Sequence, residues 1–153
     1  MFVSKRGFTI VELLVVMALM IIAAGFSLSV IASYAAHQEI ERSVTTITST
    51  LTETRQRTLS AESLSQFGVM FGTSSVAWFA EPYDQESAQL QNLPGVEVAY
   101  SFSHNEDSIL FSRLRGETNA TGTVMVSHPR SGRTIHITIE QSGRYTVEDV
   151  SAD

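Results

Sequence analysis

A long apolar stretch near the N-terminus constrains the fold more than any other feature of the chain. From Phe8 to Ile31 the only charged residue is Glu12. A helix needs about 20 apolar residues to cross a bilayer, so the stretch is long enough to do so. Lys5 and Arg6 directly precede it, and cations in this position stay on the cytoplasmic side. The sequence therefore predicts one membrane-spanning helix, with the N-terminus in the cytoplasm and the rest of the chain outside the membrane.

Glu12 is the unusual residue of this stretch. A carboxylate at the centre of a membrane helix costs about 2.5–3.5 kcal/mol on insertion scales, and such a residue usually has a function and a partner. One alternative is a side chain that reaches back to the headgroups. A secretory signal peptide is disfavoured because its apolar core is shorter, about 7–15 residues. A plain membrane anchor would leave the combination of Gly7, Phe8 and Glu12 unexplained.

The segment Gly7-Phe8-Thr9-Ile10-Val11-Glu12 resembles the class III signal of type IV pilins and of type II secretion pseudopilins. In that signal a short basic leader ends in glycine, and Phe-Thr-Leu-Ile-Glu follows. The resemblance implies that a prepilin peptidase cuts between Gly7 and Phe8, and that the new amino group of Phe8 is N-methylated. It also implies that this ammonium pairs with Glu12 of a neighbouring subunit and sets the register of assembly. Pairing would offset the cost of two lone charges in a low-dielectric medium.

The next part of the chain predicts that the helix continues beyond the apolar stretch. Between Phe8 and about Ala61 there is no proline, and the expected end lies between Leu59 and Ser65. From residue 37 onward the pattern is amphipathic, and four apolar residues recur at helical spacing. These are Ile40, Val44, Ile47 and Leu51. We expect this stripe to pack on a sheet, because a coiled-coil seam needs more heptads.

The remainder of the chain reads as β-strands joined by turns, so the predicted fold class is α+β. Val124, Val126, Ile135, Ile137 and Ile139 fall at alternate positions, which indicates an antiparallel sheet with one buried face. Trp78 and Phe79 lie mid-strand and are expected to pack in the core or on the sheet. Residues 81–92 are expected to form a loop. The predicted strands span residues 66–71, 75–80, 96–102, 108–114, 123–127, 134–139 and 145–148.

The order of turns and strands resembles the GspH/FimT family of pseudopilins and minor pilins. The matching turns contain Leu93-Pro94-Gly95-Val96, Gly122-Thr123-Val124, Gly132-Arg133-Thr134 and Ser142-Gly143-Arg144. The resemblance implies a leader at 1–7, a transmembrane half-helix at 8–31, an amphipathic half-helix at 32–64 and a β-rich domain at 65–153. The chain has no cysteine, whereas many major pilins carry a disulfide-closed loop, so a minor subunit is favoured.

The same resemblance implies a set of partners and a location. The partners are the prepilin peptidase and methyltransferase, other pilin or pseudopilin subunits, an inner-membrane assembly platform and the lipid bilayer. The expected location is the inner membrane, and then an assembled pilus or pseudopilus. Such a subunit is a building block of pilus assembly or protein secretion, not an enzyme. A membrane-anchored enzyme with an unrecognised site is the rival interpretation.

The sequence contains little that predicts a catalytic or metal site. No nucleophile motif or phosphate-binding loop is present, the four histidines are not spaced as metal ligands, and no cofactor is expected. The acidic segment 81–86 is read as a solvated loop, with a calcium site as the less favoured alternative.

Three arginines near neighbouring turns are the candidate nucleic-acid site. Arg130, Arg133 and Arg144 would form a small phosphate-binding patch, and some FimT-like minor pilins are thought to bind DNA. The favoured interpretation is that these are ordinary turn arginines that balance nearby carboxylates. The net charge of −6 also argues against a general nucleic-acid binder. A minor pilin of DNA uptake therefore remains the alternative function.

Overall fold

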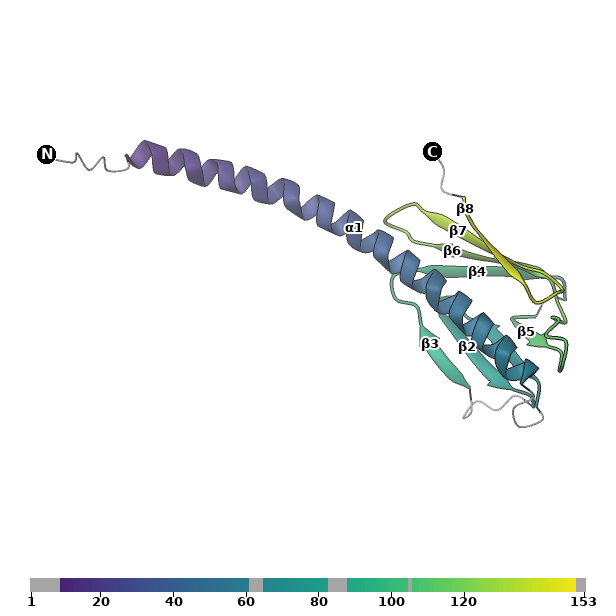
Figure 1. Cartoon of the computed structure of the whole chain (residues 1–153). Helices are drawn as coiled ribbons and strands as arrows, with labels where there is room; N and C mark the ends of the chain where they lie inside the picture. The colour runs from purple at the N-terminus through teal and green to yellow at the C-terminus, as the bar shows by residue number, and fades with distance from the viewer. Residues whose placement is uncertain (1–8, 61–64, 83–87, 105, 151–153) are drawn as a thin grey trace, which may run out of the picture. The chain divides into compact units, whose positions relative to one another are not determined.

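The computed structural model describes residues 9–60, 65–82, 88–104 and 106–150, apart from the side chains of residues 26–33. The chain divides into two compact units, Met1–Ala35 and Ala36–Asp153. The helix α1 (Ile10–Leu59) contributes to both units, and all the strands belong to the second unit (Figure 1). The predicted long helix is confirmed, and it ends at the early limit of the expected range.

Threonines are frequent in the second half of α1, although threonine is a mediocre helix former. The hydroxyls of Thr50, Thr54 and Thr58 each donate a hydrogen bond to the carbonyl four residues earlier, at 2.7–3.0 Å. All three side chains are buried. A hydroxyl satisfied by its own helix can be buried without a partner from another element, so these residues extend the stripe that packs on the sheets.

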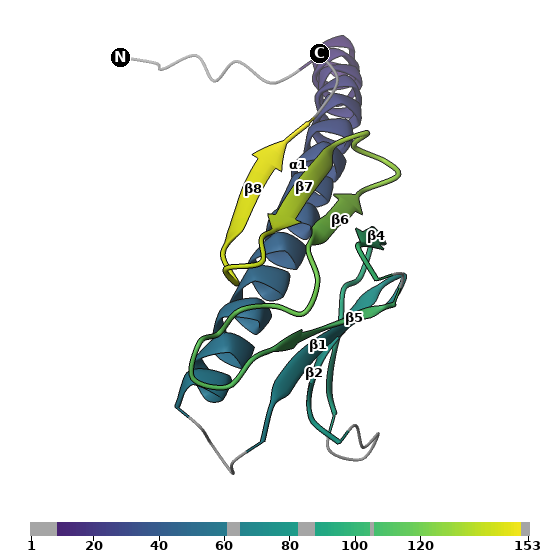
Figure 2. The same cartoon turned by 90° about the vertical axis from the view of Figure 1, so that its right-hand side faces the viewer.

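Eight strands in the described residues form two antiparallel sheets of four strands each. The first sheet has the order β3-β2-β1-β5 and the second has the order β4-β6-β7-β8 (Figures 1 and 2). This arrangement confirms the predicted α+β, pilin-like fold, in which an N-terminal helix packs on antiparallel sheets. The strands are β1 (Phe67–Phe71), β2 (Ser75–Ala80), β3 (Gln89–Asn92), β4 (Glu97–Phe102), β5 (Ser108–Phe111), β6 (Gly122–Ser127), β7 (Thr134–Ile139) and β8 (Tyr145–Asp149).

Two strand predictions were wrong in detail. Residues 89–92, expected in a loop, form β3, an exposed edge strand that pairs only with β2. Its polar composition carries no alternating apolar signal, so the tertiary pairing alone makes it a strand. The strand expected at 108–114 stops at Phe111, because the chain turns there and the Gly116 N–H bonds the Ser112 carbonyl at 2.9 Å. Leu114 then has a φ of 67°, which a strand does not allow.

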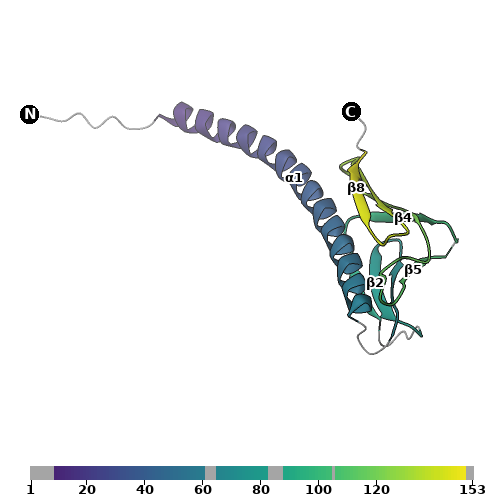
Figure 3. The same ribbon diagram turned by 45° about the vertical axis from the view of Figure 1, so that its right-hand side comes forward.

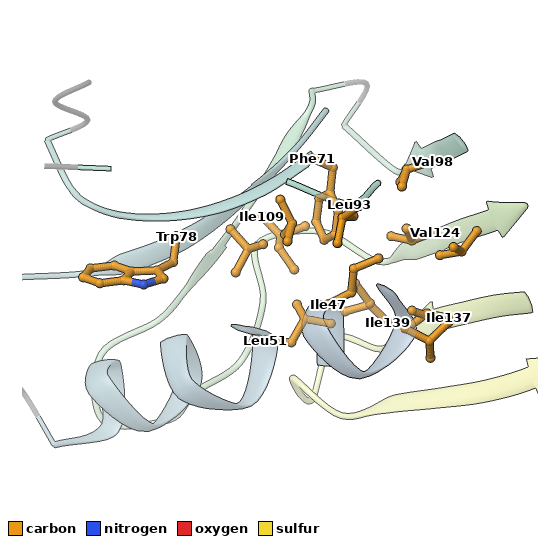
Figure 4. Close-up of a cluster of buried hydrophobic side chains, with 14 of the residues drawn as sticks. Ile47, Leu51, Phe71, Trp78, Leu93, Val98, Ile109, Val124, Ile137 and Ile139 are labelled. Carbon is orange, nitrogen blue, oxygen red and sulfur yellow. The ribbon is translucent and has the colours of Figure 1, made fainter. Parts of the chain in front are cut away.

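One apolar core joins α1 to both sheets. The predicted stripe is confirmed, since Ile40 and Ile47 are fully buried and Leu51 is 2% exposed. Figure 4 shows Ile47 and Leu51 pointing from α1 toward side chains of the sheets. The alternating residues of β6 and β7 are buried as predicted. Trp78 also lies in the core, with the Arg57 guanidinium 4.4 Å from the centre of its ring.

Candidate functional site

The start of α1 is a capped helix terminus that contains Glu12. The helix begins at Ile10, and the Glu12 N–H donates a hydrogen bond to Thr9 Oγ1 at 3.2 Å. The Leu13 N–H bonds the Thr9 carbonyl, also at 3.2 Å. Thr9 is therefore the N-cap, and Glu12, three residues later, occupies the glutamate position of a capping box. A negative charge in the first turn also interacts favourably with the helix dipole.

The helix in the first unit exposes apolar side chains on every side. Residues 10–25 are all exposed, and the eleven large apolar residues among them are 43–80% exposed. Glu12 is the one charged residue of this segment. A helix that is apolar all round needs an apolar environment, either lipid or other protein chains. The large apolar residues are Ile10, Val11, Leu13, Leu14, Val15, Val16, Met17, Leu19, Met20, Ile21 and Ile22.

The predicted cleavage site, Gly7 and Phe8, lies outside the described residues, as do Lys5 and Arg6. Within the described residues, no helical segment combines the length and the apolarity that crossing a membrane requires.

The structure places the three candidate arginines in two separate turns. Arg130 and Arg133 both lie in the connection between β6 and β7, and Arg133 directly precedes β7. Arg144 directly precedes β8. Arg130 and Arg144 are exposed, and among the described contacts only their main-chain N–H groups donate hydrogen bonds.

Arg133 is held between two carboxylates from distant parts of the chain. Its Nη1 donates to Glu41 Oε1 of α1 at 2.7 Å, and its Nη2 and Nε donate to Asp149 Oδ2 of β8 at 2.6 and 2.8 Å. These hydrogen bonds, first that to Asp149 and then that to Glu41, raise the pKa of the Arg133 side chain, so its charge persists. The side chain is 22% exposed and ties the end of the last strand to the helix.

His128 makes a second connection between α1 and the β6–β7 turn. The N–H groups of Arg130 and Ser131 donate to its Nδ1 at 3.1 and 3.3 Å. Nδ1 must therefore carry a lone pair, which places the ring proton on Nε2, 3.0 Å from Glu39 Oε2. The histidine is 4% exposed and fully hydrogen-bonded. Gly95, with a φ of 78°, packs against this pair, and a side chain there would collide with the Glu39 carboxylate.

Neither of these two connections was predicted from the sequence. The partners are 89 residues apart for Glu39 and His128, and 92 residues apart for Glu41 and Arg133. The only local signal was two acidic residues on the helix next to the apolar stripe. Both connections are structural, because each joins α1 to the turn between β6 and β7.

No metal-binding arrangement is present in the described parts of the chain, where no three His, Cys, Asp or Glu residues gather. Of the acidic segment considered for calcium, Glu81 is described, whereas Asp84 and Glu86 lie outside the described residues. One of the four histidines, His136, is half-buried on β7 opposite Met125.

The comparison with protein families found one match, to the model described as the prokaryotic N-terminal methylation motif, over residues 3–28. Neither the curated proteins nor the solved structures contain a significant match to the chain. The matched segment includes Gly7 and Phe8, where cleavage is predicted, as well as Thr9 and Glu12, and it ends before the second compact unit. The chain thus carries a prepilin-type N-terminal methylation motif, which supports a type IV pilin-like protein.

Proposed function

We propose that this protein is a structural subunit of a type IV pilus or of a type II secretion pseudopilus, specifically a minor subunit of the GspH/FimT kind. The observation that carries the proposal is the methylation motif at residues 3–28. It overlaps the apolar part of α1, residues 10–25, in which Glu12 is the one charged residue. The helix supplies an assembly surface, and the second unit supplies a folded domain for display.

Before assembly the subunit is held in the inner membrane. Residues 8–31 form the membrane half of the helix, residues 32–64 its amphipathic half, and residues 65–153 the domain outside the membrane. Lys5 and Arg6 keep the N-terminus in the cytoplasm. The exposed apolar side chains in the first part of α1 support this stage, because their transfer from water into lipid is favourable.

Processing then prepares the subunit for assembly. The prepilin peptidase cuts between Gly7 and Phe8, where glycine lets the enzyme approach the backbone closely. The released amino group of Phe8 is methylated and pairs with Glu12 of a neighbouring subunit. The exposed position of Glu12 supports this role, since its carboxylate is not engaged by the described residues of its own chain. Pairing stabilises both charges in an apolar filament core.

A DNA-binding role in uptake is the less supported proposal. It would use Arg130, Arg133 and Arg144, but Arg133 is engaged by Glu41 and Asp149. Two exposed arginines in separate turns of an acidic chain provide little attraction for phosphates.

Mass spectrometry of the membrane-associated protein tests the proposed processing. In cells with an active prepilin peptidase, we expect the chain to begin at N-methylated Phe8. The Gly7→Val variant should keep its leader, because a β-branched side chain obstructs the enzyme at the scissile bond. Wild-type protein from peptidase-deficient cells is the control and should also keep residues 1–7. An intact leader on the wild-type chain in peptidase-positive cells would refute the proposal.

A further inference from the structure

We infer that the outer edge of β8, at Tyr145 and Val147, is a binding site for an extended segment of a partner protein, which adds to the second sheet as a fifth strand. The site includes the outer edge of β8, which lies at one end of the second sheet (Figures 2 and 3). It also includes a groove lined by residues of α1 and by Tyr145 of β8. The segment that fits has alternating apolar side chains, a basic N-terminal end and an acidic C-terminal end.

The main chain of β8 has unused hydrogen-bonding groups. The Glu140 N–H bonds the Arg144 carbonyl at 2.9 Å, and the Val150 N–H bonds the Thr134 carbonyl at 3.0 Å. Because residues alternate along an antiparallel ladder, the even-numbered residues of β8 face β7, and Tyr145 and Val147 direct their N–H and C=O groups outward. In the described residues these outward groups have no partner. Such an edge is a template for another strand.

The other sheet edges are protected in ways that β8 is not. The Val98 N–H on β4 already bonds the Thr73 carbonyl at 2.8 Å, and the Leu110 N–H on β5 bonds Asn119 Oδ1 at 2.8 Å. The edge strand β3 is short and polar. All five residues of β8 are exposed, and none is a proline or lysine, the residues that commonly guard an edge.

The inner face of β8 is apolar but uncovered. Tyr145 and Val147 pair with Ile139 and Ile137, so their side chains share the face of the sheet that forms the core. The isoleucines are buried, whereas Tyr145 is 38% and Val147 is 43% exposed. A strand beside β8 would place its own apolar side chains next to these two and continue the core outward.

A groove beside β8 provides space for those side chains. A cavity of about 270 Å³ lies between α1 and the start of β8. The Tyr145 hydroxyl lies 3.3 Å from Thr52 Oγ1, and both residues line the cavity. Both apolar and polar groups line the cavity, and the residues are Leu51, Thr52, Arg55, Gln56, Leu59, Gly143, Arg144 and Tyr145.

Charge sets the direction of the bound segment. Arg55 and Arg144 lie at the N-terminal end of β8, and the acidic Glu148 lies near its C-terminal end. Arg55 is fixed there because its Nε and Nη2 donate to the carbonyls of Gly116 and Ser142 at 3.1 and 3.3 Å. A segment that runs antiparallel to β8 therefore brings its C-terminal end to the arginines, where an acidic residue and a terminal carboxylate are favoured.

Peptide binding to the full chain in detergent micelles tests the inference. The probe is the fluorescently labelled peptide Lys-Thr-Val-Thr-Val-Thr-Glu with a free carboxyl terminus, and anisotropy measures its affinity. We expect saturable binding to the wild-type chain. Since the Val147 N–H points outward, Val147→Pro removes a donor to the peptide but no bond to β7. Val147→Thr is the matched control. The affinity of Val147→Pro for the peptide should be roughly fivefold lower than that of Val147→Thr, which corresponds to the loss of about one hydrogen bond.

Two further arms separate strand addition from other binding. The reversed peptide, Glu-Thr-Val-Thr-Val-Thr-Lys, should bind the wild-type chain more weakly than the first peptide does. In the Arg144→Glu variant, this difference in affinity between the two peptides should become smaller or change sign. If circular dichroism shows that Val147→Pro is misfolded, a peptide N-methylated on alternate residues replaces it as the test. This peptide lacks the N–H groups that would donate to the outward carbonyls of β8, and it should bind the wild-type chain more weakly than the unmethylated peptide. Absence of saturable binding, or equal affinities for the paired variants or peptides, would overturn the inference. The unassembled chain is used, so the result is independent of leader cleavage.

Discussion

At the scale of single residues, Glu12 combines a local and an intermolecular role. Within its own chain it occupies the third position of the helix, where its N–H is capped by Thr9 and its charge suits the helix dipole. Between chains, we propose that it pairs with the amino group of Phe8 from a neighbour. The cap uses the main-chain N–H, whereas the interaction with the helix dipole and the proposed pair both use the carboxylate.

Substitution separates these roles. Glu12→Ala should leave membrane insertion intact, because it removes a charge from an apolar helix, but should sharply reduce incorporation into filaments. Thr9→Ala weakens the cap, by about 0.5–2 kcal/mol, and should leave incorporation close to wild type. Immunoblots of membrane and sheared-filament fractions measure both variants. If Glu12→Ala enters filaments as well as the wild type, the register role is excluded.

At the scale of elements, α1 is joined to the second sheet by two polar connections as well as by the core. His128 and Arg133, at either end of the β6–β7 turn, reach Glu39 and Glu41 on the helix. The two partners of the first pair differ in burial, since the side chain of His128 is 4% exposed and that of Glu39 is 44% exposed. Their contributions to stability should therefore differ.

Thermal unfolding of the full chain in micelles, followed by fluorescence of the single tryptophan, tests this difference. His128→Ala leaves two main-chain N–H groups in the turn without an acceptor and should cost about 2–3 kcal/mol. Glu39→Ala removes the acceptor of the His128 Nε2–H, but water can enter the partly exposed position that the carboxylate leaves and accept this bond, so the cost should be at most about 1 kcal/mol. Equal losses for the two variants would show that the turn does not depend on the Nδ1 acceptor.

At the scale of the whole molecule, the two compact units have opposite chemistry. The first unit exposes apolar side chains and has no buried core in its described residues, whereas every residue of the core cluster belongs to the second unit, from Ile40 to Ile139. The second unit therefore contains what it needs to fold.

The fragment from residue 36 to residue 153 should consequently be soluble and unfold cooperatively in urea. Ile47→Ala should destabilise this fragment by about 2–5 kcal/mol, because Ile47 is fully buried between helix and sheets. The exposed Leu90→Ala variant is the control and should change the free energy of unfolding by less than about 0.5 kcal/mol. A fragment without a cooperative transition would contradict the assignment of the core to this unit.

Local patterns in the sequence predicted much of this architecture. The spacing of Ile40, Val44, Ile47 and Leu51 predicted the buried helix stripe, and the alternation in β6 and β7 predicted their core face. Both are periodic signals that a short segment carries by itself. The exposed edge strand β3 carries no such signal, and its prediction as a loop was wrong.

By itself, the sequence determined the long helix, most of the strands and the motif, because helix periodicity, strand alternation and the run from Gly7 to Glu12 are encoded by neighbouring residues. Only the tertiary structure decided that the strands divide between two sheets, that β8 is left with a free edge, and that Glu39 and Glu41 meet His128 and Arg133. The helix-to-turn contacts join residues 89 and 92 positions apart. Like the order of the strands, they follow from how the elements pack and not from any local pattern.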